Sequence, residues 1–324
     1  MKIRSLKNLA NAHSDSIWAV TWAPATAERG ALLITGSVDE TVKVWKGDDL
    51  ELDRTNTGHA LGVVSVAAHP SGTMAASTSL DSFVRVFDVD SNATITTLET
   101  APSEAWLIQF DPKGEILAVA GGGSGSVKLW NTNNWRMEVP LTIPKAEAGE
   151  GRSSEKQSGS GKFVLAVAWS NDGKRLACST MSGVVAIFDA VRGKFLHTLE
   201  GHHMPVRSMA FSPVDTRVLF TVSDDKHVHM YDVESRSLIS AFSGHASWVL
   251  SVDVSPDGSC LATGSSDRTV RLWDLTMRTA VQTLNDHSDQ VWSVAFRPPG
   301  GDGVRSGRLA SVSDDRSISL YEYT

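Results

Sequence analysis

Cysteine and long apolar segments are both scarce in this sequence of 324 residues. Cys178 and Cys260 are the only cysteines, so no disulfide framework can hold the chain together and a reducing compartment is expected. No apolar run approaches the roughly 18 residues that a membrane-spanning helix needs. The first residues, MKIRSLKNLANAH, lack the apolar core of a signal peptide. We therefore expect a soluble intracellular protein with no membrane partner.

An excess of basic residues is also missing. The chain has 30 Lys and Arg against 37 Asp and Glu, a net charge of -7. A broad phosphate-binding surface needs clustered positive charge, so we expect no direct contact with nucleic acid. Tryptophan, by contrast, is abundant, with ten residues against three tyrosines, and this suggests a periodic structure.

Seven similar segments carry an aromatic residue at the same place. They read TVKVWK, FVRVFD, SVKLWN, VVAIFD, HVHMYD, TVRLWD and SISLYE. Their aromatic residues are Trp45, Phe87, Trp130, Phe188, Tyr231, Trp273 and Tyr321. Four of the six intervals are 42 or 43 residues, and the other two, of 58 and 48 residues, contain insertions. The chain is therefore a seven-fold repeat.

Histidine, serine and aspartate accompany the aromatic residue in five repeats. The sets are His13, Ser37 and Asp39; His59, Ser79 and Asp81; His202, Ser223 and Asp225; His245, Ser265 and Asp267; and His287, Ser313 and Asp315. We expect each set to form a buried hydrogen-bonded network with its aromatic residue, completed by the N–H of Trp45 or Trp273. Tyr231 and Tyr321 could supply hydroxyls, whereas Phe87 cannot. Repeats three and four lack histidine and aspartate, so we expect apolar packing to hold them.

Each repeat predicts four short strands, the third of which carries the aromatic residue. Too few residues follow Tyr321 for a fourth strand in the last repeat. Residues 3–10, however, precede His13 as a fourth strand precedes His245. We therefore expect the N-terminal strand to complete the last repeat and leave no free sheet edge there.

The spacing of these residues resembles that of the WD-repeat family of β-propellers, including the Gly-His pairs at Gly58, Gly201 and Gly244. The resemblance covers the whole chain. It implies an all-β, seven-bladed WD-repeat β-propeller closed by the N-terminal strand, with residues 1–324 forming a single domain. Residues 145–161 are rich in Gly, Ser, Glu and Lys and are interpreted as a flexible insertion between blades 3 and 4, either simply tolerated or in contact with a partner. Residues 298–307 are interpreted as a shorter insertion.

The recurring Ser, His and Asp residues do not predict an enzyme. A catalytic triad is one constellation beside an oxyanion site, whereas these residues occur at matching positions in five repeats. GGGSGSVK (121–128) lacks the Lys-Ser/Thr ending of a phosphate-binding loop. His202, His203, His227 and His229 have no cysteine pair or acidic partner at zinc-ligand spacing. We expect no catalytic activity, no metal and no cofactor.

Three of the remaining tryptophans occupy one repeated position. Counted along the first strand of each repeat, the equivalent residues are Trp18, Val64, Trp106, Leu165, Arg207, Leu250 and Trp292, with Trp248 just outside this set. In a propeller they would surround the mouth of the central channel. Aromatic residues and arginine on a concave rim are typical of a protein-binding hot spot, although tryptophans that merely pack between blades would give the same pattern. We expect Trp18, Trp106, Trp248 and Trp292, with Leu165 and Leu250, to bind a partner, and Arg207 to accept a polar or acidic group from it.

The segments SGHASWVLSVDVSPDG, HTLEGHHMPVRSMAFSP and NDHSDQVWSVAF resemble those of one eukaryotic subfamily. This subfamily is the WD subunit shared by the superkiller complex and the RNA polymerase II-associated factor complex. The resemblance implies a non-catalytic scaffold of nucleus and cytoplasm, acting in transcription elongation, histone modification and mRNA decay. It also implies a monomeric propeller that docks a tetratricopeptide-repeat or other helical subunit, or polymerase-associated factor subunits, within a hetero-complex. The alternative is a reader of histone tails or phosphopeptides, but a phosphate reader would need several basic residues at the mouth.

Overall fold

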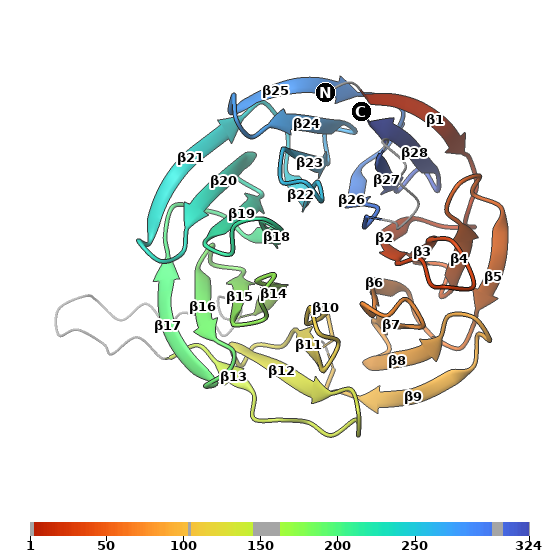
Figure 1. Cartoon of the computed structure of the whole chain (residues 1–324), viewed down its shortest axis with the longest axis horizontal. Helices are drawn as coiled ribbons and strands as arrows, with labels where there is room; N and C mark the ends of the chain where they lie inside the picture. Colours follow the sequence, from red (N-terminus) through yellow and green to blue (C-terminus); the bar gives the residue numbers. More distant parts are fainter. Residues whose placement is uncertain (1–2, 103–104, 145–162, 300–306, 324) are drawn as a thin grey trace.

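The computed structural model describes residues 3–102, 105–144, 163–299 and 307–323. These residues form seven four-stranded antiparallel sheets, the blades, arranged as a ring around a central axis (Figure 1). All regular elements in these ranges are strands, and they include no helix that could cross a membrane. The expected all-β, seven-bladed fold is confirmed.

The strands of the first four blades follow one another along the chain. Blade 1 contains β2 (Ile17–Ala23), β3 (Leu32–Ser37), β4 (Val42–Lys46) and β5 (Leu52–Asn56). Blade 2 contains β6 (Val63–Ala68), β7 (Met74–Ser79), β8 (Phe83–Asp88) and β9 (Thr94–Glu99). Blade 3 contains β10 (Leu107–Phe110), β11 (Ile116–Ala120), β12 (Ser126–Asn131) and β13 (Leu141–Thr142). Blade 4 contains β14 (Val164–Trp169), β15 (Arg175–Thr180), β16 (Val185–Asp189) and β17 (Lys194–Leu199).

The last three blades continue the same order, and the seventh takes one strand from the N-terminus. Blade 5 contains β18 (Val206–Phe211), β19 (Val218–Ser223), β20 (His227–Asp232) and β21 (Ser237–Ser243). Blade 6 contains β22 (Val249–Val254), β23 (Cys260–Ser265), β24 (Val270–Asp274) and β25 (Thr279–Leu284). Blade 7 contains β26 (Val291–Phe296), β27 (Gly307–Ser313), β28 (Ile318–Tyr323) and β1 (Ile3–Leu9).

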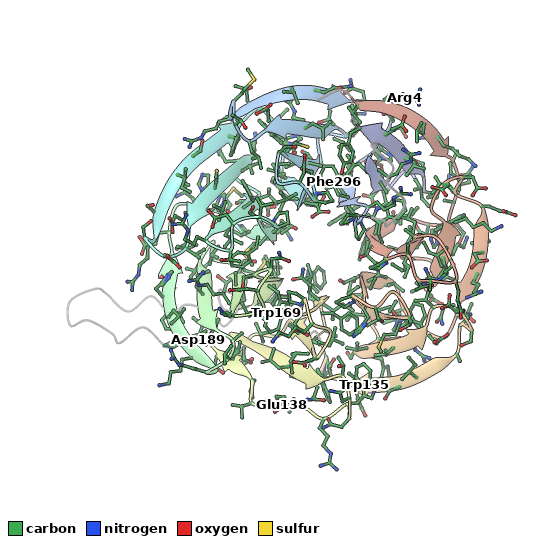
Figure 2. All side chains as sticks on the ribbon, in the orientation of Figure 1. Arg4, Trp135, Glu138, Trp169, Asp189 and Phe296 are labelled. Atoms are coloured by element: carbon green, nitrogen blue, oxygen red, sulfur yellow. The ribbon has the colours of Figure 1, made fainter. Side chains whose placement is uncertain are left out.

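Burial decreases from the axis of the ring to its circumference. The inner strand β14 is buried along its whole length, whereas most residues of the outer strand β5 are exposed. Neighbouring blades cover both faces of an inner strand, which suits the unbroken apolar sequence VLAVAW of β14. Figure 2 shows the same gradient, with Trp169 and Phe296 near the axis and Arg4 at the circumference.

Apolar side chains fill the space between neighbouring blades. Between blades 7 and 1, Trp22 and Leu33 belong to one buried cluster with Val312 and Leu320. The indole N–H of Trp22 also donates to the carbonyl of Ala295 at 3.0 Å. Burying one large apolar side chain stabilises a fold by about 1.5–3 kcal/mol, so each blade depends on its neighbours.

The ring is closed by backbone pairing between the two ends of the chain. β1 pairs antiparallel with β28, in a register that runs from Ile3 opposite Tyr323 to Leu9 opposite Ile318. The inner strand β2 of blade 1 contacts β26 of blade 7 as it contacts β6 of blade 2. The expected closure by the N-terminal strand is confirmed.

Blade 3 has the shortest outer strand of the described sheets. β13 contains two residues, and the chain just before it includes Pro140, which has no N–H to donate to a neighbouring strand. On the other side of Pro140, the amide of Glu138 donates to the carbonyl of Leu129 in β12 at 2.8 Å. The insertion expected at 145–161 lies outside the described residues, as does most of the one expected at 298–307.

Removing residues 1–9 tests the role of the closing strand. The free energy of unfolding should fall by at least about 2 kcal/mol, because the deletion removes the buried side chain of Ile3 from the core and leaves β28 without its backbone partner. The exposed edge of β28 should also promote self-association. Chemical denaturation and light scattering measure the two effects. Leu6→Ser, which changes only an exposed side chain of β1, is the control and should resemble the wild type.

Candidate functional site

A chain of four hydrogen-bonded side chains crosses blade 1. The indole N–H of Trp45 donates to Thr35 Oγ1 at 2.9 Å, and Thr35 Oγ1 lies 2.8 Å from His13 Nε2. His13 Nδ1 lies 3.0 Å from Asp39 Oδ2. One arrangement satisfies every group: Thr35 donates to Nε2, and the neutral imidazole donates from Nδ1 to Asp39.

The same chain recurs in four other blades. Blade 6 repeats it in full with Trp273, Thr263, His245 and Asp267. Blades 2, 5 and 7 have no tryptophan at this position, but they keep the histidine, the hydroxyl residue and the aspartate. These residues are His59, Ser77 and Asp81; His202, Thr221 and Asp225; and His287, Ser311 and Asp315. In blade 7 the Tyr321 hydroxyl lies 3.3 Å from Ser311 Oγ, whereas Phe87 in blade 2 offers no donor.

The hydroxyl between the histidine and the aromatic residue was not predicted from the sequence. We expected a serine two residues before the aspartate, such as Ser37, but the bridging residue is two positions earlier, at Thr35 in blade 1. The equivalent residues are Ser77, Thr221, Thr263 and Ser311. A threonine or serine four residues before each aspartate was a readable signal in the sequence.

Tyr231 does not take the expected place in the network of blade 5. Its hydroxyl donates to the carbonyl of Glu200 at 3.0 Å and lies 3.0 Å from His229 Nδ1. The ring of His229 stacks on that of His202, with centroids 3.9 Å apart. His229 therefore engages the hydroxyl that we expected to join the network of His202, Ser223 and Asp225.

The predicted serines connect two loops instead. Ser37 Oγ donates to the carbonyl of Ser16 at 2.8 Å and accepts from the amide of Asp39 at 3.1 Å. The same tie to the loop carbonyl is made by Ser79, Ser223, Ser265 and Ser313. Each serine joins the turn between the second and third strands of a blade to the loop that precedes the first strand. We call the face that carries these turns and loops the upper face.

The turn between the second and third strands requires one residue with a positive φ angle. In blades 1, 2, 5, 6 and 7 this residue is Glu40, Ser82, Lys226, Arg268 and Arg316. The preceding aspartate caps each of these turns, as Asp39 Oδ1 does by accepting from the amide of Thr41 at 3.1 Å. In blades 3 and 4, which lack the aspartate, the position is Gly125 or Gly183, and glycine adopts this conformation without strain.

Blades 3 and 4 also lack the rest of the network. The indole N–H of Trp130 has no hydrogen-bond partner in the described part of the chain. Apolar clusters surround this region, with Leu117 and Val119 on one side and Leu176 and Phe188 on the other.

The networks change the proton affinity of their members. Burial lowers the pKa of His13 and His59 despite their hydrogen bonds to aspartate, which keeps both imidazoles neutral. Burial alone would raise the pKa of Asp39 and Asp267, but the hydrogen bonds from histidine and threonine outweigh it and lower the pKa of both carboxyls. Burial, and then the electrostatic interaction with His202, lower the pKa of His229 to about 4.

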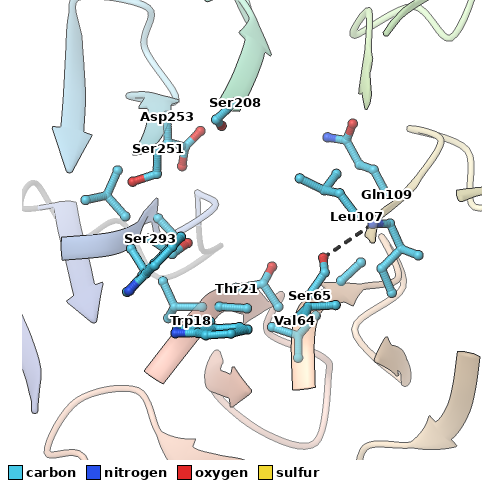
Figure 3. Close-up of a pocket in the computed structure, with 18 of the residues that line it drawn as sticks. Trp18, Thr21, Val64, Ser65, Leu107, Gln109, Ser208, Ser251, Asp253 and Ser293 are labelled. Atoms are coloured by element: carbon cyan, nitrogen blue, oxygen red, sulfur yellow. Dashed lines mark hydrogen bonds between the residues drawn. The ribbon is translucent and has the colours of Figure 1, made fainter. Parts of the chain in front are cut away.

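The predicted mouth residues surround a cavity of about 360 Å³ on the axis of the ring (Figure 3). Six of the seven equivalent residues line it, and we call them the mouth ring: Trp18, Val64, Trp106, Arg207, Leu250 and Trp292. The seventh, Leu165, is buried and does not line the cavity. Trp248 lies outside the ring, as expected, and is 45 % exposed.

Asp314 holds two tryptophans of the mouth ring together. The indole N–H groups of Trp292 and Trp18 donate to its Oδ1 at 2.7 and 3.3 Å. The two rings lie 5.4 Å apart at an interplanar angle of 41°. The pair presents aromatic surface beside a carboxylate, which suits a cationic or amide group better than an anion.

Arg207 is already paired, so the structure does not leave it free to accept an acidic group. Its guanidinium donates to both oxygens of Asp224, at 2.8 and 2.7 Å, and lies 5.8 Å from the ring of Trp248. Asp224 occupies in blade 5 the position that Asp314 occupies in blade 7, just before the turn aspartate. An aspartate just before the turn aspartate therefore recurs in the sequence at Asp224 and Asp314, and it was not among the predicted site residues.

Exposed apolar side chains extend the mouth ring over the upper face. Five apolar residues in the turns and loops of the upper face, none of them in the mouth ring, are 37–48 % exposed: Leu61, Leu80, Met181, Met204 and Trp248. They belong to blades 2, 4, 5 and 6, whereas the corresponding loops of blades 1 and 7 carry the exposed acids Asp15 and Asp289. A partner would therefore meet an apolar sector and an acidic sector on one face.

Two known protein families together match most of the chain. The family described as WD domain, G-beta repeat matches residues 3–46, 51–88, 236–274 and 278–322. The family described as Nucleolar protein 10-like, N-terminal domain, matches residues 95–249.

Individual relatives are similar over large parts of their length. The WD repeat-containing protein VIP3 of Arabidopsis thaliana is 66% identical over 324 residues, which is all of both chains. The WD repeat-containing protein SL1-17 of Schistosoma mansoni is 36% identical over 70% of this chain and 70% of its own. The meiotic recombination protein rec14 of Schizosaccharomyces pombe is 26% identical over 69% of this chain and 68% of its own.

Thr263→Val tests the bridging hydroxyl. The isosteric change leaves His245 Nε2 and the indole N–H of Trp273 buried without a partner, so the free energy of unfolding should fall by about 1–3 kcal/mol. Urea denaturation measures the loss. Thr283→Val, on the exposed outer strand of the same blade, is the matched control and should change stability by less than about 0.5 kcal/mol. Equal stability of the two variants would refute the structural role of the network.

Stability should also fall as the pH is lowered. The pKa values of His13 and His59 are lower in the folded state than in the unfolded chain, so the unfolded state binds more protons below about pH 6.5. The network aspartates add a loss below about pH 4 for the same reason. Asp253, whose pKa is raised to about 6, acts in the opposite direction but is outnumbered. Urea midpoints between pH 7.5 and 4.5 test this, and a flat or rising stability on acidification would contradict it.

Proposed function

The chain belongs to the WD-repeat family of β-propellers, and on that premise we propose that it is a non-catalytic scaffold that binds another protein across the mouth ring. The single observation that carries the proposal is the aromatic mouth, where Asp314 binds the indole N–H groups of Trp18 and Trp292 beside the cavity of about 360 Å³. Rigid aromatic side chains around a concave site are the usual anchors of protein-protein contacts. The exposed apolar residues of the upper face supply further contact area.

We further propose that the scaffold is a subunit of the RNA polymerase II-associated factor complex in the nucleus and of the superkiller complex in the cytoplasm. The support is the resemblance of the mouth-forming segments to that subfamily, together with the full-length similarity to the plant protein VIP3. A tetratricopeptide-repeat or other helical subunit fits the upper face, because the apolar side of a helix can cover its exposed leucine and methionine residues.

A second candidate function is the recognition of a histone tail or a phosphopeptide. The free acidic residues of the upper face favour a basic tail, whereas Arg207, the one basic residue of the mouth ring, is neutralised by Asp224. Salt-sensitive affinity for basic tails would support recognition of a histone tail, and low affinity for phosphorylated peptides would exclude recognition of a phosphopeptide.

Trp106→Ala and Trp292→Ala should weaken binding of the partner by about 2 kcal/mol, or roughly thirtyfold, because each removes an aromatic anchor. A pull-down with the wild-type protein identifies the partner, and calorimetry with the purified partner measures the affinity of each variant. Both variants should keep the circular dichroism and unfolding midpoint of a closed ring.

Met277→Ala is the matched control, since Met277 is 68% exposed on the face opposite the mouth. This variant should bind like the wild type. Wild-type affinity in both folded tryptophan variants would overturn the proposed site.

A further inference from the structure

Asp253 places an unpaired carboxylate in the wall of the channel below the mouth ring. Its Oδ2 accepts from the amide of Phe296 at 2.7 Å and its Oδ1 from the amide of Val254 at 2.8 Å. No ion pair joins it to a basic side chain within the described ranges, unlike Asp224, which Arg207 neutralises. Burial raises the pKa of Asp253 to about 6, so the group is still ionised at neutral pH.

The bond from Asp253 to the next blade does not explain the charge. Gln109 occupies the equivalent position in blade 3, and its Oε1 accepts from the amide of Trp169 in blade 4 at 3.1 Å. A neutral amide thus makes the same tie between blades that Asp253 makes between blades 6 and 7. An uncompensated carboxylate costs desolvation energy that the amide avoids, so the tie between blades is not a reason to prefer aspartate here.

The wall around Asp253 is rich in hydroxyl groups. Ser251 and Ser208 lie near its carboxylate in Figure 3, with Gln109 across the channel. Ser251 is 6% exposed, and its Oγ has no hydrogen-bond partner among the described residues. Beside the cavity, in the part of the chain that the structure describes, the buried Ser251 hydroxyl thus has no hydrogen-bond partner, and the Asp253 carboxylate has two amide donors but no basic side chain to balance its charge.

Building on the proposed binding at the mouth, we infer that the channel receives the cationic end of a lysine or arginine side chain of the partner, with Asp253 as its counterion. Asp253 lies three positions beyond Leu250 at the mouth, a depth of roughly 10 Å along the strand, so only a long side chain reaches the carboxylate from a segment lying on the upper face. The aromatic rings of Trp18 and Trp292 line the cavity that this side chain would enter, and an aromatic face attracts a cation.

Small cations test the channel separately from the partner. The full-length protein is titrated with n-butylammonium, n-propylguanidinium and neutral n-butanol, and amide NMR signals of Val254 and Phe296, the donors to Asp253, are followed. At least one cation should bind at least about tenfold more tightly than butanol, and the preferred cation distinguishes a lysine end group from an arginine one. Equal binding of cations and butanol by the wild type would overturn the inference, whatever the variants do.

Asp253→Gln removes the charge and copies the residue found at the equivalent position, Gln109. Cation affinity and partner affinity should both fall about tenfold, while the ring stays closed. Asp15→Asn, which removes an exposed acid of the upper face, is the control for general electrostatic attraction and should change cation affinity less than twofold.

The two proposals fail in different ways. Unchanged partner affinity in Asp253→Gln, with loss in Trp292→Ala, would overturn the channel counterion and leave binding at the mouth standing. Unchanged partner affinity in both Trp106→Ala and Trp292→Ala would overturn the proposed function, while the titration with n-butylammonium would still decide whether the channel holds a cation.

Discussion

Closure of the ring is the constraint on which the rest of this molecule depends. Every blade buries apolar surface against two neighbours, and blades 1 and 7 have both neighbours only because β2 meets β26 at the seam. The pairing of β1 with β28 secures this seam with backbone hydrogen bonds, which a sheet edge would otherwise offer to other chains. Since the mouth ring draws its residues from six blades, its geometry is a property of the closed ring and of no single repeat.

The hydrogen-bonded networks hold the loops that surround this mouth. A short loop without helices has few apolar contacts, so its position depends on how its backbone groups are satisfied. The aspartate caps one turn and accepts from the histidine, and the serine carries the connection to the neighbouring loop carbonyl. Where the set is missing, the turn uses Gly125 or Gly183 in place of a capped residue. The same turn conformation is thus stabilised by an aspartate cap in five blades and permitted by a glycine in the other two.

Much of the fold could be predicted from the sequence because it repeats. Seven copies of one pattern fix the number of blades, the phase of the strands and the need for residues 3–10 to complete the last blade. The network was harder to predict, since Ser37 and Thr35 are both hydroxyl residues of one strand and sequence does not say which reaches His13. The pairing of Arg207 was not predicted for a similar reason: its partner, Asp224, comes from the turn after the next strand, and only the three-dimensional structure brings the two together.

The distribution of charge around the axis follows from these pairings. Arg207 forms an ion pair with Asp224, so the mouth ring has no unpaired basic side chain. Asp314 and Asp253, in contrast, place carboxylates at the mouth and below it without a basic partner among the described residues. The indole N–H groups beside Asp314 stabilise its charge without cancelling it, and the two backbone amides do the same for Asp253. An anionic partner group would therefore meet negative potential at both depths, and a cationic one would be attracted at both. The proposed preference for cations would add selectivity to an aromatic mouth that, taken alone, would bind any apolar surface.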